Sequence, residues 1–223
     1  MSPDFFLPPD FGIEVLYTVL IMIFTFLVFY KTREIYELTK HKGVQFFRYA
    51  FILLGLAYAS RLFLYGSLLK SSLSFEPFSR PSPFLAPVSS LLLAYFSTLA
   101  ILYLLYSTIW REYKTEHFLT IANSVALLIS IIAFISRSPL AVLLSQVVLL
   151  VALVVMNIRN HKGDKKKTPM YALYFLIALF WLVSLLVMSG MRIQFSLWLK
   201  LVLEAISLSA MVVLYYKISR WVR

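Results

Sequence analysis

Residues 139–168 read PLAVLLSQVVLLVALVVMNIRNHKGDKKKT: twenty uncharged, mostly apolar residues followed by a basic turn. About 20 apolar residues is the length of helix that crosses the hydrocarbon layer of a membrane. A helix is the expected form because backbone groups in lipid must be hydrogen-bonded within their own segment. This stretch therefore predicts a membrane-spanning helix with positive charge at one end.

Six further apolar runs of similar length fill most of the remaining chain. The seven predicted spans cover residues 12–31, 47–69, 86–109, 118–136, 139–158, 170–190 and 195–217. Hydrophobic residues make up 61% of the chain and charged residues only 14%, whereas a soluble domain has about 25% charged residues. We therefore predict an all-α integral membrane protein, a seven-transmembrane-helix bundle that forms one domain over residues 1–223 without a soluble domain. The expected location is the cell membrane, as a multi-pass protein.

The 21 lysine and arginine residues are divided unequally between the two sides of these spans. Fifteen lie at the ends of the first, third, fifth and seventh spans or in the segments that follow: Lys31, Arg33, Lys40, Lys42, Arg48, Arg111, Lys114, Arg159, Lys162, Lys165, Lys166, Lys167, Lys217, Arg220 and Arg223. Four lie on the other side: Lys70, Arg80, Arg137 and Arg192. An excess of these residues in short loops marks the cytoplasm, so we predict the N-terminus outside and the C-terminus in the cytoplasm. Asp4, Asp10 and Glu14 are interpreted as the outer flank of the first span.

The segment after the first span has the pattern of a helix that continues beyond the membrane. Its charged residues Glu34, Glu37 and Lys40 recur at helical spacing, which allows neighbouring turns to form ion pairs. Gly43 follows, and glycine is the commonest residue just after the end of a helix. We therefore predict that the first helix continues through Thr32–Lys42 and stops at Gly43.

Away from the ends of the predicted spans, three charged residues lie at hydrocarbon depth: Arg61 in the second span, and Lys200 and Glu204 in the seventh. A charged side chain at the centre of a bilayer costs about 2.5–3.5 kcal/mol on insertion scales, so these residues mark candidate sites. At about 1.5 Å per residue, Arg61 and Glu204 both lie roughly 12–14 Å below the outer boundary. This common depth predicts an intramembrane salt bridge between Arg61 and Glu204, with Lys200 one turn above.

Two interpretations of this polar cluster stay open. In the first, Arg61, Lys200 and Glu204 form a ligand or ion site, which Tyr95 and Gln146 line because they lie at similar depth. Two cations against one anion would favour a carboxylate, phosphate or halide. In the second, the salt bridge only holds two helices together, and the lysine extends to the outer headgroups.

Composition and residue patterns disfavour several other functions. The chain has no cysteine, which excludes disulfides, thiolate nucleophiles and cysteine metal sites. His41, His117 and His161 lie in or beside the predicted cytoplasmic loops without a second ligand at helical spacing, so no metal and no cofactor are expected. No span carries the paired acids or the Ser/His set of a hydrolase, so we assign no catalytic residue and expect no enzyme. The net charge of +11 is attributed to the membrane edges rather than to nucleic acid binding.

Basic residues on the predicted cytoplasmic side are the candidates for contact with anionic lipid headgroups or with a partner. They are Lys31, Arg33, Lys40, Lys42, Arg48, Arg159, Lys162, Lys165, Lys166 and Lys167. The expected partners are membrane lipids and a second copy of the chain or another membrane protein. Continuous helices with few polar groups favour a non-enzymatic sensor, receptor-like protein or accessory subunit. The alternative is a channel or transporter for a small ion, an anion by the charge of the cluster, with an oligomer forming the pore.

Overall fold

The computed structural model describes residues 11–73, 85–110, 115–136, 140–163, 169–190 and 196–222. These residues form seven helices: α1 (Phe11–Thr39), α2 (Lys42–Leu73), α3 (Leu85–Ile109), α4 (Thr115–Ser136), α5 (Leu140–Gly163), α6 (Pro169–Gly190) and α7 (Leu197–Val222). Each of the seven predicted apolar runs corresponds to one of these helices. The helices extend up to eight residues beyond the predicted spans, most of all at the basic end of α1.

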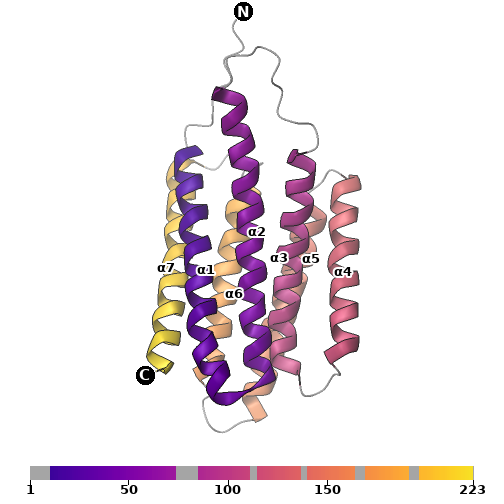
Figure 1. Cartoon of the computed structure of the whole chain (residues 1–223), viewed down its shortest axis with the longest axis vertical. Coiled ribbons are helices and arrows are strands. Elements are labelled where there is room, and N and C mark those ends of the chain that lie inside the picture. Colours follow the sequence, from indigo (N-terminus) through magenta and orange to yellow (C-terminus); the bar gives the residue numbers. More distant parts are fainter. Residues whose placement is uncertain are drawn as a thin grey trace, which may run out of the picture.

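Six of the helices form a closed ring around a common core. Each helix packs against the next in the order α1, α2, α3, α5, α6, α7, and α7 packs back against α1. Helix α4 lies outside this ring and packs against α3 and α5 (Figure 1). The helices run alternately up and down, so the start of α1 lies at one end of the bundle. The turn between α1 and α2 and the C-terminus lie at the other (Figure 1).

The length and outer surface of the helices are those of a membrane protein. Helices α1, α2, α3, α4, α5 and α7 are long and apolar enough to cross a membrane, and α6 contributes the shorter apolar helix Ala172–Val187. Large apolar side chains such as Ile135, Val148 and Trp198 point outward and are largely exposed. Exposed apolar surface of this extent is stable in lipid and unfavourable in water. The chain is therefore an all-α, multi-pass membrane protein.

Inward-facing residues of α1 show how the ring is packed. Tyr17, Ile21, Val28 and Ile35 recur at intervals of four and seven residues, the spacing of one helix face, and all are buried. They belong to one apolar cluster with residues of α2, α3, α5, α6 and α7, among them Phe47, Phe51, Ile101, Leu153, Ile177, Phe180, Met211 and Leu214. Side chains from all six helices of the ring thus meet in one apolar cluster.

The turn between α1 and α2 differs from the prediction. Helix α1 ends at Thr39, and Lys40 adopts a left-handed backbone conformation with φ of 51°. The Lys40 N–H donates to the carbonyl oxygen of Tyr36 at 2.7 Å, which satisfies one of the free carbonyls at the helix end. The prediction that α1 continues to Lys42 and stops at Gly43 is therefore wrong, because Gly43 lies in the first turn of α2.

Gly43 has a steric role in place of the predicted capping role. A Cβ atom at this position would lie 2.9 Å from the backbone carbonyl oxygen of Ser107, near the end of α3, and 3.1 Å from the His41 ring. Glycine at position 43 therefore allows the first turn of α2 to approach the backbone of α3. Gly66, also in α2, has nothing within 4 Å of the equivalent position.

We expect Gly43→Ala to destabilise the protein by about 1–3 kcal/mol, the usual effect of adding a methyl group to a filled contact. Gly66→Ala is the matched control and should be neutral or stabilising by up to about 1 kcal/mol, because alanine favours helix. Reversible unfolding of both variants in mixed micelles measures the difference. Equal stability of the two variants would show that the contact with Ser107 does not constrain position 43.

Candidate functional site

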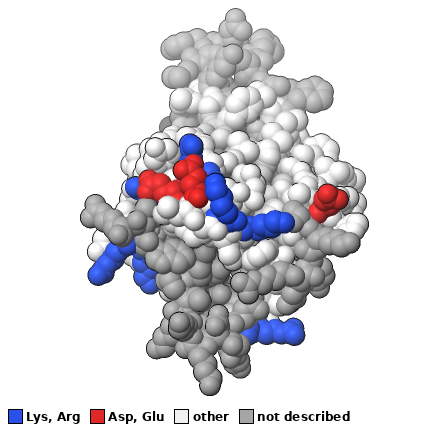
Figure 2. All heavy atoms as spheres, turned by 60° about the horizontal axis from the view of Figure 1, so that its bottom comes forward, with Lys and Arg blue, Asp and Glu red and all other residues white. Residues whose placement is uncertain are grey.

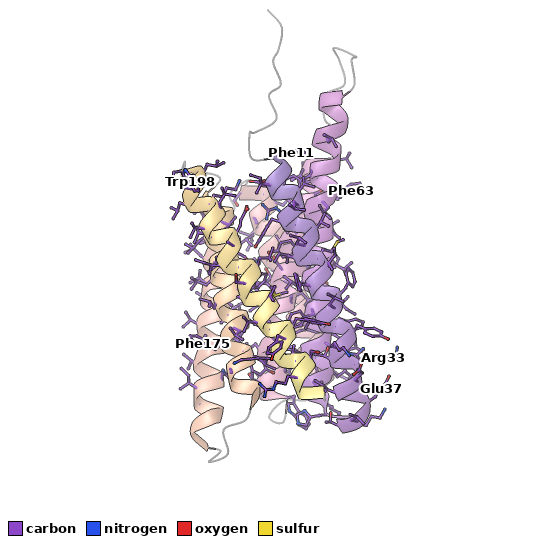
Figure 3. The ribbon with its side chains drawn as sticks, turned by 90° about the vertical axis from the view of Figure 1, so that its left-hand side faces the viewer. Phe11, Arg33, Glu37, Phe63, Phe175 and Trp198 are labelled. Carbon is purple, nitrogen blue, oxygen red and sulfur yellow. The ribbon has the colours of Figure 1, made fainter. Side chains whose placement is uncertain are left out.

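Charged side chains from three helices meet near the end of the ring where α1 begins. Glu14 lies in the first turn of α1, Arg61 in α2, and Lys200 and Glu204 in α7. Figure 3 labels residues close to them in sequence, Phe11, Phe63 and Trp198, at this end of the bundle, while Arg33 and Glu37 lie toward the opposite end. Glu14 is 7% exposed, and Arg61 and Glu204 are each 5% exposed. These four side chains are called the charge cluster below.

The Glu14 carboxylate is the acceptor at the centre of the charge cluster. Lys200 Nζ donates to its Oε1, and the Tyr65 hydroxyl donates to its Oε2 at 2.6 Å. Arg61 Nη2 lies 3.8 Å from the same Oε2, and Arg61 Nε donates to the Tyr65 hydroxyl at 2.7 Å. One carboxylate therefore links α1 to both α2 and α7, and a tyrosine on α2 orients the arginine toward it.

Glu14 is the residue that the sequence analysis misplaced. It was interpreted as part of an acidic outer flank, although the predicted span begins at residue 12. In the structure Glu14 lies in the first turn of α1 and on its buried face. Its spacing to Tyr17, Thr18 and Ile21 follows the i, i+3, i+4, i+7 pattern, which was the available signal. With Glu14 included, two carboxylates face two cations, and the net positive charge expected for the cluster becomes zero.

The predicted residues of α7 lie on one face of the helix, one turn apart. Lys200 is largely buried and contacts Glu14, and Glu204 is buried next to it along the helix. The predicted salt bridge between Arg61 and Glu204 stays a prediction. The structure places the Glu14 carboxylate beside Arg61, with 3.8 Å between Arg61 Nη2 and Glu14 Oε2.

Tyr95 and Gln146 lie in other seams of the bundle. The Tyr95 hydroxyl donates to Asn123 Oδ1 at 2.7 Å between α3 and α4. Gln146 Nε2 donates to Ser97 Oγ at 2.6 Å, and Gln146 Oε1 accepts from Trp181 Nε1 at 3.3 Å, so that it connects α5 with α3 and α6. The structure thus brings Arg61 and Lys200 together through Glu14. Tyr95 and Gln146 lie in separate interhelical contacts.

A group of hydroxyls continues the polar region toward the middle of the bundle. The Tyr17 and Ser207 hydroxyls lie 2.7 Å apart, the Tyr58 hydroxyl donates to Ser184 at 3.4 Å, and the two serine oxygens are 3.3 Å apart. Three of these residues lie one turn from a member of the charge cluster on the same helix. Sequence analysis did not find this group, because a hydroxyl in a span carries no charge to mark it. Together with the charge cluster it forms a polar column between α1, α2, α6 and α7.

The opposite end of the bundle carries most of the described basic side chains (Figure 2). Lys31 pairs with Glu34 at 3.1 Å, and Arg33 with Glu37 at 2.6 Å. The other predicted contact residues that the structure describes at this end are Lys40, Lys42, Arg48 and Arg159; Arg48 is half-buried and the other three are exposed. Lys165, Lys166, Lys167 and the side chain of Lys162 lie outside the described residues.

The chemistry available to the charge cluster is ionic. Among the described residues, no three His, Asp or Glu side chains are grouped to hold a metal ion. A buried carboxylate between an ammonium and a guanidinium can gain a proton or exchange one cation for another ion. Either change alters the contacts between α1, α2 and α7, because each of these helices supplies one of the charges.

We expect Glu14→Ala to destabilise the protein by about 3–5 kcal/mol, because removal of one partner leaves buried cations without their carboxylate. Glu34→Ala removes an equally charged residue from a half-exposed pair on the same helix and should cost less than about 1 kcal/mol. Unfolding of both variants in mixed micelles measures the difference. Equal losses would mean that the Glu14 contacts contribute no more than a surface ion pair. Combining Glu14→Ala with Lys200→Ala should recover part of the loss.

Comparisons with known proteins give one informative match. No protein-family model and no solved structure matches the chain. A protein of Archaeoglobus fulgidus, described as an uncharacterized protein, is 32% identical over 226 residues. The matched region covers 99% of this chain and 97% of that protein, so the two correspond along their whole lengths. The chain therefore belongs to the family of this Archaeoglobus fulgidus protein.

Proposed function

We propose that this protein is a non-enzymatic membrane sensor, receptor-like protein or accessory subunit. Its responsive element is the charge cluster, and its output is the basic end of the bundle. The observation that carries the proposal is the Glu14 carboxylate, which joins α1, α2 and α7 at one end of the ring. All three helices continue to the other end. A change of charge at Glu14 would therefore alter helix contacts that extend across the bundle.

The packing of the ring supports this function over the alternative, a channel or transporter for a small ion. Beyond the hydroxyl group, the interior contains the fully buried side chains Ile21, Phe51, Met211 and Leu214. A permeation path needs polar groups or water along its length. The balanced charges of the cluster also remove the reason for assigning an anion as the transported species.

The proposal includes a topology of seven spans with the N-terminus outside and the C-terminus in the cytoplasm. Support comes from the position of the basic residues: the ends of α1 and α7 carry exposed Lys and Arg side chains at the same end of the bundle. Positive residues favour the cytoplasmic side of the cell membrane. The basic end would then face anionic headgroups and a partner, which is another membrane protein or a second copy of the chain.

The topology predicts opposite labelling of two single-cysteine variants. The chain has no cysteine of its own, so Gly12→Cys and Leu38→Cys each introduce one thiol, at exposed positions near the two ends of α1. A maleimide that does not cross membranes should label the Gly12→Cys variant in intact cells and the Leu38→Cys variant only after permeabilisation. The reverse result would invert the topology, and labelling of both in intact cells would contradict a single orientation.

The sensor function predicts coupling between the two ends of the bundle. Spin labels at Leu38→Cys and Lys217→Cys report the distance between α1 and α7 at the basic end, where both residues are exposed. We expect Glu14→Gln at the opposite end to shift this distance distribution, because it weakens the contact of α1 with α7. Glu116→Gln is the control, since Glu116 is exposed on α4 outside the ring. An unchanged distribution in the Glu14→Gln variant would refute the coupling.

Ion flux into liposomes tests the alternative directly. Vesicles that contain the purified protein should show no more chloride, potassium or proton flux than empty vesicles, because large apolar side chains pack together inside the ring. Specific flux that disappears in Arg61→Ala would overturn the sensor proposal in favour of a channel or transporter.

A further inference from the structure

We infer that the turn between α1 and α2 carries a binding site for the phosphate group of an anionic membrane lipid. The site consists of Arg48 on α2 and of Phe29, Tyr36 and Lys40, in or just after α1, and it is called the Arg48 site. It lies at the basic end of the bundle, far from the charge cluster. The inference goes beyond the sensor function and does not depend on it.

Arg48 presents a guanidinium that aromatic rings hold in place. Its Cζ lies 4.6 Å from the centroid of the Phe29 ring and 5.5 Å from that of the Tyr36 ring. Contacts with ring faces stabilise the positive charge but accept no strong hydrogen bond from its five N–H donors. Within the described residues, the buried Nε makes no hydrogen bond. The aromatic rings therefore orient the half-buried guanidinium without supplying an acceptor for its N–H donors.

Neighbouring carboxylates are already paired with other cations. Glu34 accepts from Lys31 at 3.1 Å, and Glu37 accepts from Arg33 at 2.6 Å, both along α1. None of the ion pairs found among the described residues includes Arg48. An arginine in a partly apolar position is stabilised by an anion, and the planar guanidinium matches the oxygens of a phosphate.

Lys40 supplies a second cation next to the aromatic ring of Tyr36. Its Nζ lies 5.7 Å from the Tyr36 centroid, so both cations flank one aromatic side chain. Lys40 also occupies the left-handed position with φ of 51°. That conformation costs roughly 1–2 kcal/mol for most residues and is usually left to glycine or asparagine. A lysine at this strained position, where glycine would fit without strain, supports a role for its charge at this turn.

The position of the Arg48 site indicates a lipid rather than a soluble anion. Arg48 lies within the apolar helix Lys42–Gly66, six residues or about 9 Å from its start, which is headgroup depth if that end is at the membrane surface. Tyr30 and Tyr49 are exposed nearby, and aromatic residues of this type gather at membrane interfaces. Further toward the middle, exposed Phe26 lies next to α2 at Gly55 and offers apolar surface to an acyl chain.

Native mass spectrometry of the full chain in a neutral detergent tests the Arg48 site. The protein is titrated with phosphatidylglycerol and with phosphatidylcholine of the same acyl chains. We expect one phosphatidylglycerol to bind with clear preference. Arg48→Gln should weaken this binding roughly ten- to a hundredfold, the usual effect of losing charge-assisted hydrogen bonds. Arg220→Gln is the matched control, because it removes one exposed arginine from the same end of the bundle and should leave binding unchanged.

Lys40→Gly separates binding from folding. Glycine adopts the left-handed conformation without strain, so this variant should unfold at a higher temperature than the unmodified protein and yet bind phosphatidylglycerol several-fold more weakly. The test therefore stands even if the Arg48→Gln variant does not fold.

Three results would overturn the inference. Equal binding by the Arg48→Gln and Arg220→Gln variants would show that charge alone attracts the lipid. Equal binding of the two lipids by the unmodified protein would show that the anionic headgroup is not recognised. Displacement of the lipid by millimolar inorganic phosphate, sensitive to Arg48→Gln, would assign the site to a soluble anion.

Discussion

The closure of the helix ring depends on the cations and hydrogen-bond donors that surround the buried Glu14 carboxylate. A carboxylate removed from water is destabilised by several kcal/mol unless cations and donors replace the lost hydration. Here α7 supplies an ammonium, and α2 supplies a phenol and a guanidinium. Glu14 and Lys200 are 186 residues apart, so no short loop brings them together. In lipid, contact between apolar surfaces does not favour one neighbouring helix over another, because lipid tails are equally apolar. Directional polar contacts of this kind specify which helix closes the ring.

The sequence was sufficient for the helices, and it was only partly sufficient for the site. Apolar runs predict helices well because the requirement for internal hydrogen bonds in a membrane leaves few alternatives. Depth along a helix can also be counted, and this count predicts Arg61 and Glu204 at one level of the bundle, with Lys200 one turn above. The structure places Arg61 and Lys200 on either side of Glu14, a residue that the count left out. The direction in which a residue faces depends on helix order in the ring. Tyr95 and Gln146 have suitable depth but face α4 and the α3–α6 seam, which no spacing rule could show.

The turn between α1 and α2 illustrates a second limit of sequence patterns. Glycine after a charged helix predicts a helix end because glycine readily adopts positive φ. At Gly43 the reason for glycine is instead the nearby carbonyl of Ser107 on α3, a contact between segments distant in sequence. The positive φ occurs at Lys40, a residue that the pattern placed inside the helix. One residue type serves two different physical needs, and only the three-dimensional packing distinguishes them.

Charged side chains are arranged differently at the two ends of the α1–α2 hairpin, because their surroundings differ. At the end that holds Glu14 and Arg61, opposite charges are buried together, as burial away from water requires. At the other end, Arg48 rests on aromatic rings, and no ion pair found among the described residues includes it. The proposed lipid phosphate would supply the missing negative charge. Between these ends the two helices are in close contact, since a Cβ at Gly55 would lie 3.1 Å from Thr25 Oγ1. The two helices thus share one closely packed interface, and a change of charge at either end of the hairpin would act on that interface.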